Sequence, residues 1–380
     1  MGKNMTSGAR RLSGNAVTLL ITALLCGGSA ALIYSGAASR QISNMLISMA
    51  CYIVMAVSLN LVVGLLGELS LGHAGFMSVG LFTGCLLSIQ LAQSVPIGVR
   101  MPLSMLLGGV AAAVVGLLVG LPALRLKGDY LAIVTLGFGE IIRIFLNNLN
   151  APVNITNGPQ GINMIRPVEV AGVSLGKSLT VMGVTVNSVY LYYYLFLILT
   201  ILTVVVCSRL QHSRIGRAWV ALREDDIAAS AMGLNIRNIK LLAFALGATF
   251  GGVAGGLFSS FQGFVSPESF GLLESIMVLS MVVLGGMGHI PGVILGAVLL
   301  TVTPEILRDV IGPVQMMAFG KMLIDPENAR MLLFGLALIL VMLLRPEGLW
   351  PNKRRKAEFH DAIDDEVPAV DSQAADGLKG

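Results

Sequence analysis

The sequence predicts an all-α polytopic membrane protein with about ten transmembrane segments, some of them broken or re-entrant. Hydrophobic residues make up 55% of the 380 residues, and charged residues only 12%. The apolar residues come in blocks of about twenty, the length with which a helix spans a bilayer. The chain also has 45 glycines, which let membrane helices approach closely and interrupt them where irregular backbone is needed.

The apolar segments follow one another along the chain. The segments at 130–147 and 272–286 are short, and clustered glycines interrupt 69–92 and 272–292, so some of these are candidates for half-spanning or re-entrant helices. In order, the ten segments are 16–36, 42–66, 69–92, 103–124, 130–147, 189–207, 241–261, 272–286, 292–312 and 329–345.

The distribution of basic residues orients the chain with both termini in the cytoplasm, because most of the 25 Lys and Arg residues then lie inside. Residues 1–41 hold the cytoplasmic N-terminus and the first transmembrane helix, for which a cleaved signal peptide is the alternative. The membrane-embedded core is 42–345, with a polar outer loop at 148–188 and a charged inner loop at 208–240. The tail, 346–380, is basic and then acidic, and is predicted to be disordered.

Sites typical of soluble enzymes have little support. The cysteines share no ligand spacing and fall in apolar runs, and the four histidines are scattered, so neither a disulfide framework nor a metal site is predicted. "AGVSLGKS" at 171–178 loosely matches a phosphate loop, but it falls in the outer loop and is interpreted as a chance match. The cysteines are Cys26, Cys51, Cys85 and Cys207.

Ionisable residues near the spans are candidates for the transport path, since charge in lipid is costly and usually functional. Glu140 and Arg143 are spaced to pair on one helix face, and a structural ion pair is favoured over a transport role. Glu68, His73 and Glu274 either line the path or lie at helix ends. No acid falls clearly in the middle of a span, which argues against an ion-coupled carrier.

Two glycine-rich stretches, 64–80 and 282–292, each hold a histidine in an apolar context. Close helix packing explains such glycines as well as function does, but two interruptions in opposite halves also fit broken helices that meet near the membrane centre. The candidate path residues are Gly72, His73, Gly75, Glu140, Glu274, Gly285, Gly286 and Gly288.

The inner loop 208–240 carries nine charged residues out of 33 and contains a predicted short helix. Asp225 or Asp226 caps its start, and Gly233 suits the left-handed position just past its end. A solvated loop is one interpretation, and a docking helix for a cytoplasmic partner is the other. One face of the helix is predicted to hold Ile227, Ala231 and Leu234.

Five motifs, in matching order over about 42–345, resemble the LivM-type permease subunit of bacterial high-affinity branched-chain amino acid ABC importers. The motifs are "NLVVGLLGELSLGHAGFMSVGLF" (60–82), "LRLKGDYLAIVTLGFGEIIR" (124–143), "ITNGPQGI" (155–162), "SRIGRAWVALREDDIAASAMGLN" (213–235) and "SIMVLSMVVLGGMGHIPGVILGA" (275–297).

The resemblance implies an inner-membrane subunit that pairs with a second, LivH-like permease and two cytoplasmic ATPases, while an extracytoplasmic protein delivers Leu, Ile or Val. ATP and Mg²⁺ would be used by the ATPases and no cofactor by this chain, and no nucleic acid is involved. The inner loop then corresponds to the coupling loop. In its pattern E-A-A-x3-G, Ala228, Ala229 and Gly233 match, but Ile227 stands where Glu is usual. The candidate coupling residues are Arg217, Arg223, Glu224, Asp225, Asp226, Ala228, Ala229 and Gly233.

Three alternatives remain open at this stage. The same architecture could import urea, short amides or another class of amino acid, because the delivering protein sets specificity. An ion-coupled secondary transporter working alone is the second alternative. A membrane-embedded enzyme is the third and has the least support, since no nucleophile–base pair falls on one span.

Overall fold

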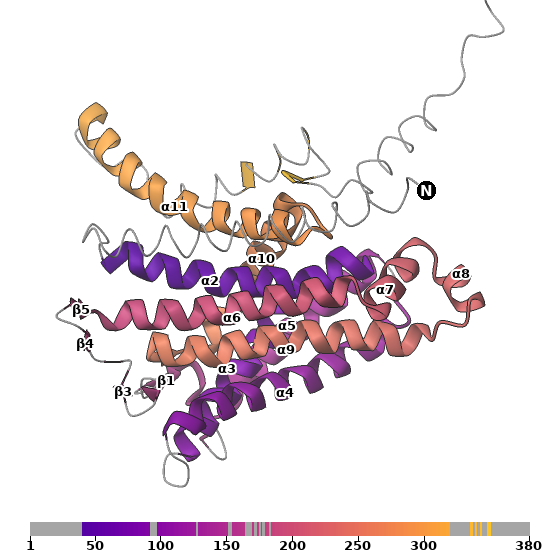
Figure 1. Cartoon of the computed structure of the whole chain (residues 1–380), viewed down its shortest axis with the longest axis horizontal. Helices are drawn as coiled ribbons and strands as arrows, with labels where there is room; N and C mark the ends of the chain where they lie inside the picture. Colours follow the sequence, from indigo (N-terminus) through magenta and orange to yellow (C-terminus); the bar gives the residue numbers. More distant parts are fainter. Residues whose placement is uncertain are drawn as a thin grey trace, which may run out of the picture.

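The computed structural model describes most of the predicted core as a bundle of long helices (Figure 1). The predicted first span, most of the last span and most of the tail lie outside the described residues. The structure describes 40–319 apart from 92–96, 127, 151–153, 164–168, 171–172, 175, 177–178 and 182–183, together with 335–336, 339, 343 and 348–350.

The helices follow the predicted apolar segments in order. They are α2 (Arg40–Asn60), the π-helical turn η1 (Leu61–Leu66), α3 (His73–Gln90), α4 (Ile97–Ala123), α5 (Asp129–Asn148), the 3-10 turn η2 (Gly158–Gln160), α6 (Ser188–Gln211), α7 (Arg214–Glu224), α8 (Asp226–Ala231), α9 (Ile236–Gln262), the 3-10 turn η3 (Pro267–Phe270), α10 (Leu272–Gly285) and α11 (Ile290–Phe319).

Six short strands among the described residues qualify the all-α prediction. All are two or three residues long, and they pair antiparallel two by two, β1 with β6, β2 with β3 and β4 with β5. They are β1 (Ile162–Asn163), β2 (Glu169–Val170), β3 (Val173–Ser174), β4 (Leu179–Val181), β5 (Val184–Val186) and β6 (Phe264–Val265). Five of them lie in the predicted outer loop.

Membrane-spanning character is confirmed for part of the predicted layout. Five helices of the described chain are long and apolar enough to cross a bilayer. The total of ten spans and the orientation of the termini stay predictions. The five stretches are Gln41–Leu66, His73–Gln90, Gly98–Pro122, Ser188–Gln211 and Ile236–Gln262.

Helix α9 is the central packing element and packs most extensively against α4 and α3, which also contact each other. Its glycines bring the backbones close together: a Cβ added at Gly80 of α3 would lie 2.2 Å from Cα of Gly252 on α9. On the other side of the bundle, α2 packs against α6 and α11. Small residues at helix contacts are how membrane helices gain van der Waals packing when lipid offers no hydrophobic driving force.

The interruption predicted in the segment 69–92 lies only at its start, because α3 is continuous from His73 to Gln90. Helix α2 continues into η1 and stops at Gly67, whose φ of 81° lies in the left-handed region that favours glycine. The chain then runs without regular structure until α3 begins at His73. Because α3 starts after this break, it begins inside the bundle rather than at its end.

A second irregular segment precedes α10, as the first precedes α3. After α9, the chain turns back through β6 and η3 before α10 begins. The backbone N–H of Ala74, in the first turn of α3, donates to Oγ of Ser275, in the first turn of α10, at 3.3 Å. A Cβ added at Gly251, in the middle of α9, would lie 3.5 Å from Nε2 of His73. The starts of α3 and α10 therefore meet about halfway along α9. The partner of α3 in this meeting is the start of α10, not the glycine-rich stretch 282–292 that the hypothesis named.

Candidate functional site

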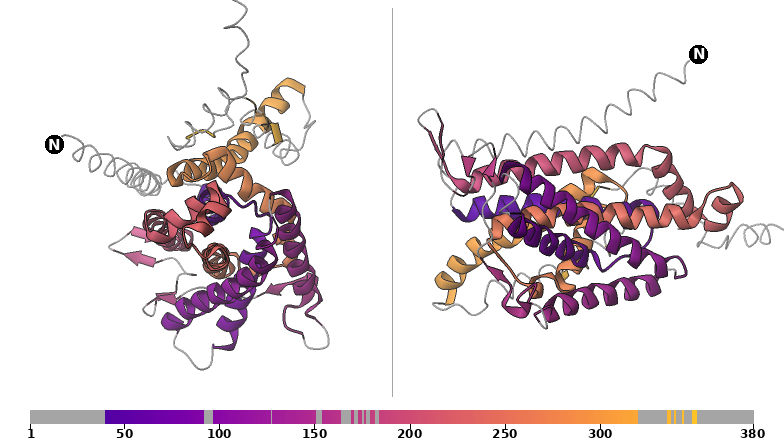
Figure 2. Two further views of the ribbon diagram at one scale, coloured as in Figure 1. Left: turned by 90° about the vertical axis from the view of Figure 1, so that its right-hand side faces the viewer. Right: turned by 90° about the horizontal axis from the view of Figure 1, so that it is seen from below.

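Helices α7 and α8 project from one end of the bundle, opposite the end that carries β4 and β5 (Figures 1 and 2). Ser213 caps α7, where its Oγ accepts from N of Gly216 at 3.2 Å. Trp219 then anchors α7, because its side chain is fully buried and its Nε1 donates to O of Ile239 on α9 at 2.9 Å. The predicted charged loop is thus a structured unit fixed to the bundle.

The capped helix predicted in this loop is confirmed as α8. The carboxylate of Asp225 accepts from N of Ile227 at 2.7 Å and from N of Ala228 at 3.1 Å. Gly233 follows the helix with a φ of 83°. A side-chain oxygen that binds the free N–H groups of the first turn typically contributes about 1 kcal/mol to the helix.

The three residues predicted to form one face of α8 do not pack together against the bundle. Ile227 is 78% exposed and Ala231 is also exposed, whereas Leu234 packs against the core. Ala229 is the buried side chain of α8, and Met232, just past the helix, is 84% exposed. The reason is that tertiary contact places Ala229 against the bundle, so the side chains on either side of it face outward.

A buried ion cluster ties α8 to the break before α3. Nζ of Lys240, on α9, lies 2.6 Å from Oε1 of Glu68 and 3.3 Å from Oδ2 of Asp226. The side chains of Lys240, Glu68 and Asp226 are only 4%, 11% and 16% exposed. Buried charges persist in this way when each has an opposite charge and hydrogen bonds, because unpaired they would be costly to desolvate.

Arg223, at the end of α7, forms a second link to the same break. Its Nη1 donates to the backbone O of Gly64 in η1 at 3.1 Å. A Cβ added at Gly67 would lie 2.7 Å from Cγ of Arg223, so the arginine stem lies directly on this glycine. Arg223 and Asp226 therefore contact the bundle of this chain, while the other predicted coupling charges, Arg217, Glu224 and Asp225, are exposed.

The two glycine-rich stretches meet at this end of the bundle. N of Gly288 donates to Oδ1 of Asn60 at 2.8 Å, and O of Gly288 accepts from Nε2 of Gln211 at 3.1 Å. A Cβ added at Gly64 would lie 2.4 Å from N of Gly288. We call the set Gly64, Glu68, Arg223, Asp226, Lys240 and Gly288 the junction.

We expect Gly64→Ala to lower the free energy of unfolding by about 1–3 kcal/mol, because the new methyl group has no space between Asn60 and Gly288. Thermal unfolding of the purified protein in detergent measures this. Gly137→Ala, in α5, is the matched control, since a Cβ there meets nothing within 4 Å. Equal unfolding midpoints for the two variants would contradict the close contact.

The other predicted path glycines lie at close helix contacts. A Cβ at Gly72 would lie 2.4 Å from O of Thr135 in α5, and one at Gly75 would lie 3.2 Å from Cα of Gly139. A Cβ at Gly285 would lie 2.3 Å from O of Gly292. Gly286 has a φ of 112°. Packing and backbone shape thus require these glycines, and their role in the path stays a prediction.

The predicted polar path residues have partners within the chain. His73 is 1% exposed, and its Nε2 lies 2.7 Å from Oγ of Ser58. Glu274, in the first turn of α10, accepts from the hydroxyl of Tyr52 at 3.0 Å. Both side chains lie at the meeting of α3 and α10, which is where a broken-helix path is expected.

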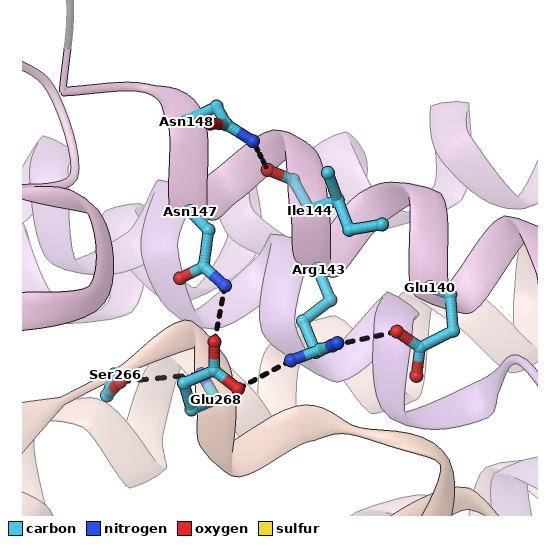
Figure 3. Close-up of polar contacts among 7 residues, drawn as sticks. All are labelled: Glu140, Arg143, Ile144, Asn147, Asn148, Ser266 and Glu268. Atoms are coloured by element: carbon cyan, nitrogen blue, oxygen red, sulfur yellow. Dashed lines mark hydrogen bonds and ion pairs between the residues drawn. The ribbon is translucent and has the colours of Figure 1, made fainter.

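The predicted pair of Glu140 and Arg143 is confirmed and is part of a larger group (Figure 3). Nε of Arg143 lies 2.8 Å from Oε2 of Glu140, and Nη1 lies 2.5 Å from Oε2 of Glu268 in η3. Asn147 donates through Nδ2 to Oε1 of Glu268 at 2.6 Å.

Sequence reasoning missed Lys240, Asn60 and Glu268 as site residues. Lys240 had a signal, since it is a lysine at the start of a long apolar helix. The partners of Asn60 and Glu268 are far away in the sequence, so no local pattern indicates them.

The chain is similar to known transport proteins over most of its length. The model of the family "Branched-chain amino acid transport system / permease component" matches residues 41–342. The chain belongs to this family. It is therefore a transport permease and not a catalytic subunit. No solved structure gives a significant match.

Relatives of the permease carry consistent names. The high-affinity branched-chain amino acid transport system permease protein LivM of Escherichia coli (strain K12) is 42% identical over 315 residues, covering 80% of this chain and 68% of the relative. A probable branched-chain amino acid transport permease protein LivM of Methanocaldococcus jannaschii is 30% identical, covering 66% and 68%. LivH of the same E. coli strain, also a permease protein of the high-affinity system, is 25% identical, covering 78% and 90%.

Proposed function

We propose that this chain is the inner-membrane permease of an ATP-driven importer that moves Leu, Ile or Val into a bacterial cell. The observation that carries the proposal is the family match over 41–342, supported by a relative that is 42% identical and named for branched-chain amino acid transport. The helix breaks before α3 and α10 support a path of the broken-helix type.

Energy enters, in this proposal, through α7 and α8, which project beyond the bundle (Figure 1). Ile227 and Met232 expose large apolar groups on a segment outside the long apolar helices, where water would otherwise contact them. Such groups are typical of a surface that another protein covers. Glu224 and Asp225, also exposed, would set the register of the contact more than its affinity.

The junction gives this contact a physical route into the membrane. Movement of α8 displaces Asp226, which shares Lys240 with Glu68. Movement of α7 displaces Arg223, which holds O of Gly64. Both links reach the segment between η1 and α3, so a push on the helices moves the start of a broken helix rather than the whole bundle. A packed element with two discrete arrangements can transmit coupling over such a distance.

The partners follow from the same proposal. The importer holds two ATPases that use ATP and Mg²⁺, one of which docks on α7 and α8, while this chain binds no cofactor. A second permease, LivH-like, forms the other wall of the path, and the likeness of this chain to LivH itself supports a pair of related subunits. An extracytoplasmic binding protein meets the end that carries β4 and β5. Gly72, His73, Gly75, Glu274 and Gly285 then belong to the region that opens and closes.

ATP dependence separates this function from the alternatives. Uptake of leucine by proteoliposomes that hold the complete importer should require internal ATP and persist when ion gradients are collapsed. Loss of uptake with the proton or sodium gradient, without any need for ATP, would support an ion-coupled carrier instead. Uptake of urea or short amides in preference to leucine would keep the architecture and change the cargo.

Orientation has its own test, because α8 must face the ATPases. In a Ser230→Cys variant, the exposed thiol on α8 should react with a membrane-impermeant maleimide in inverted vesicles and not in intact cells with a permeable outer membrane. Cys51, Cys85 and Cys207 are buried, so the unmodified protein serves as the background control. Labelling from outside the cell alone would contradict docking of a cytoplasmic ATPase.

A further inference from the structure

A polar group on the surface of α5 is not used by the junction. We call Glu140, Arg143, Asn147 and Glu268 the α5–η3 cluster (Figure 3). It lies on the outward side of the break: Thr135, two turns before Arg143 on α5, accepts from N of Leu71 through its Oγ1 at 3.0 Å. Eight residues of helix rise by about 12 Å. Along α5, the cluster therefore lies up to that far beyond the contact with Leu71, toward the end of the bundle opposite α8. It lies close to the first turn of α3, because a Cβ added at Gly75 would lie 3.2 Å from Cα of Gly139.

The cluster does not suit a surface that faces lipid. Two carboxylates share one guanidinium, so the group carries a net negative charge. The side chains of Arg143, Glu140 and Glu268 are 27%, 32% and 54% exposed. Charge is costly next to hydrocarbon, so in a membrane protein it normally faces a bundle interior, a water-filled cavity or the aqueous surface. We infer that this side of α5 faces the path.

The cluster also has unused hydrogen-bonding capacity. A guanidinium has five N–H groups, and Arg143 uses its Nε and Nη1 in the two contacts with carboxylates that the described residues provide. Within the described part of the chain, the buried Oδ1 of Asn147 accepts no hydrogen bond. Donors for an anion and acceptors for a cation are therefore available within one small group.

We propose that the α5–η3 cluster binds the charged headgroup of the transported amino acid. The α-carboxylate takes the unused N–H groups of Arg143, and the α-ammonium takes the carboxylates of Glu140 and Glu268. Each charge of the zwitterion then finds an opposite charge, which offsets the cost of leaving water. The aliphatic side chain would lie against apolar side chains of the path beside the cluster.

This inference rests on the proposed function and narrows it. A neutral cargo such as urea or an amide has no charge for either half of the cluster. The site therefore selects α-amino acids, and the apolar surface beside it favours aliphatic ones. A purely structural role, in which Arg143 only holds η3 against α5, makes a different prediction for the variants described next.

Leucine import and ATP hydrolysis are measured together in proteoliposomes with the complete importer. Glu140→Gln replaces one carboxylate that would bind the ammonium with a neutral amide but leaves the contact between Arg143 and Glu268 in place, so the α5–η3 packing survives. We expect import to fall by at least about 10-fold, because a hydrogen bond to a charged group is worth roughly that factor or more. ATP hydrolysis stimulated by the loaded binding protein should stay near the wild-type rate, since the junction is unchanged.

A charge-reversed variant separates binding from structure. Arg143→Glu combined with Glu268→Arg keeps an opposite-charge pair between α5 and η3 but inverts the sites for ammonium and carboxylate. We expect import to stay at least about 10-fold low in this variant as well. Asn148→Ala is the matched control, because its amide bonds only to O of Ile144 on its own helix among the contacts described, and it should import normally.

Two results would overturn the headgroup site. One is normal import by Glu140→Gln, and the other is recovery of import in the reversed pair, which would assign the cluster a structural role. These results differ from the result that would contradict the proposed function, in which the wild-type importer itself does not import leucine with ATP. Membrane levels and unfolding midpoints of all variants accompany the assay.

Discussion

Replacing Lys240 with methionine should lower the free energy of unfolding by about 3–5 kcal/mol, because two nearly buried carboxylates then lose their shared cation. Lys240 lies 2.6 Å from Glu68 and 3.3 Å from Asp226, and its side chain is only 4% exposed. Thermal unfolding in detergent and the amount of protein in the membrane measure the effect. This is the largest stability effect we expect from a single substitution in the described chain.

Two control variants test whether the loss of stability comes from the unpaired carboxylates. Arg237→Met removes a basic residue from the same turn of α9, but Arg237 is exposed, so its effect should stay within about 0.5 kcal/mol. Adding Glu68→Gln and Asp226→Asn to Lys240→Met removes the unpaired charges and should restore much of the stability. If Lys240→Met unfolds at the same temperature as Arg237→Met, the ion cluster does not hold the junction together.

Adding charge to the exposed apolar groups of α8 should stop transport without unfolding the bundle. In the double variant Ile227→Glu and Met232→Glu, we expect leucine-stimulated ATP hydrolysis and uptake to fall at least about 10-fold, since a buried charge without a partner in a contact surface costs several kcal/mol. Both side chains are more than three-quarters exposed in the chain alone, so its unfolding midpoint should not change. Uptake and co-purification with the ATPases are the two measurements.

Asn238→Glu provides a control, because it adds a negative charge of the same kind at an exposed position in the first turn of α9, just beyond α8. It should leave uptake near the wild-type value. Full activity of the double variant would show that the ATPases dock elsewhere, and the coupling role of α8 would have to be abandoned.

Local features of this chain could be predicted because their causes are local. The apolar blocks predict the long helices, and the Asp225 cap with Gly233 predicts the short helix α8, since both follow from hydrogen bonds and φ angles within a few residues. The break before α3 was indicated by clustered glycines. The Glu140–Arg143 pair was indicated by its spacing on one helix face.

The sequence by itself determined a membrane-embedded helical permease, the order of its helices and a capped helix in its charged loop. Tertiary structure alone decided which charges meet: Lys240 and Glu68 are 172 residues apart, and Arg143 and Glu268 are 125 apart. It also turned Ile227 outward and Arg223 inward. The physical reason is that propensity, caps and periodicity act over a few residues, whereas the partner of a buried charge is set by how distant helices pack.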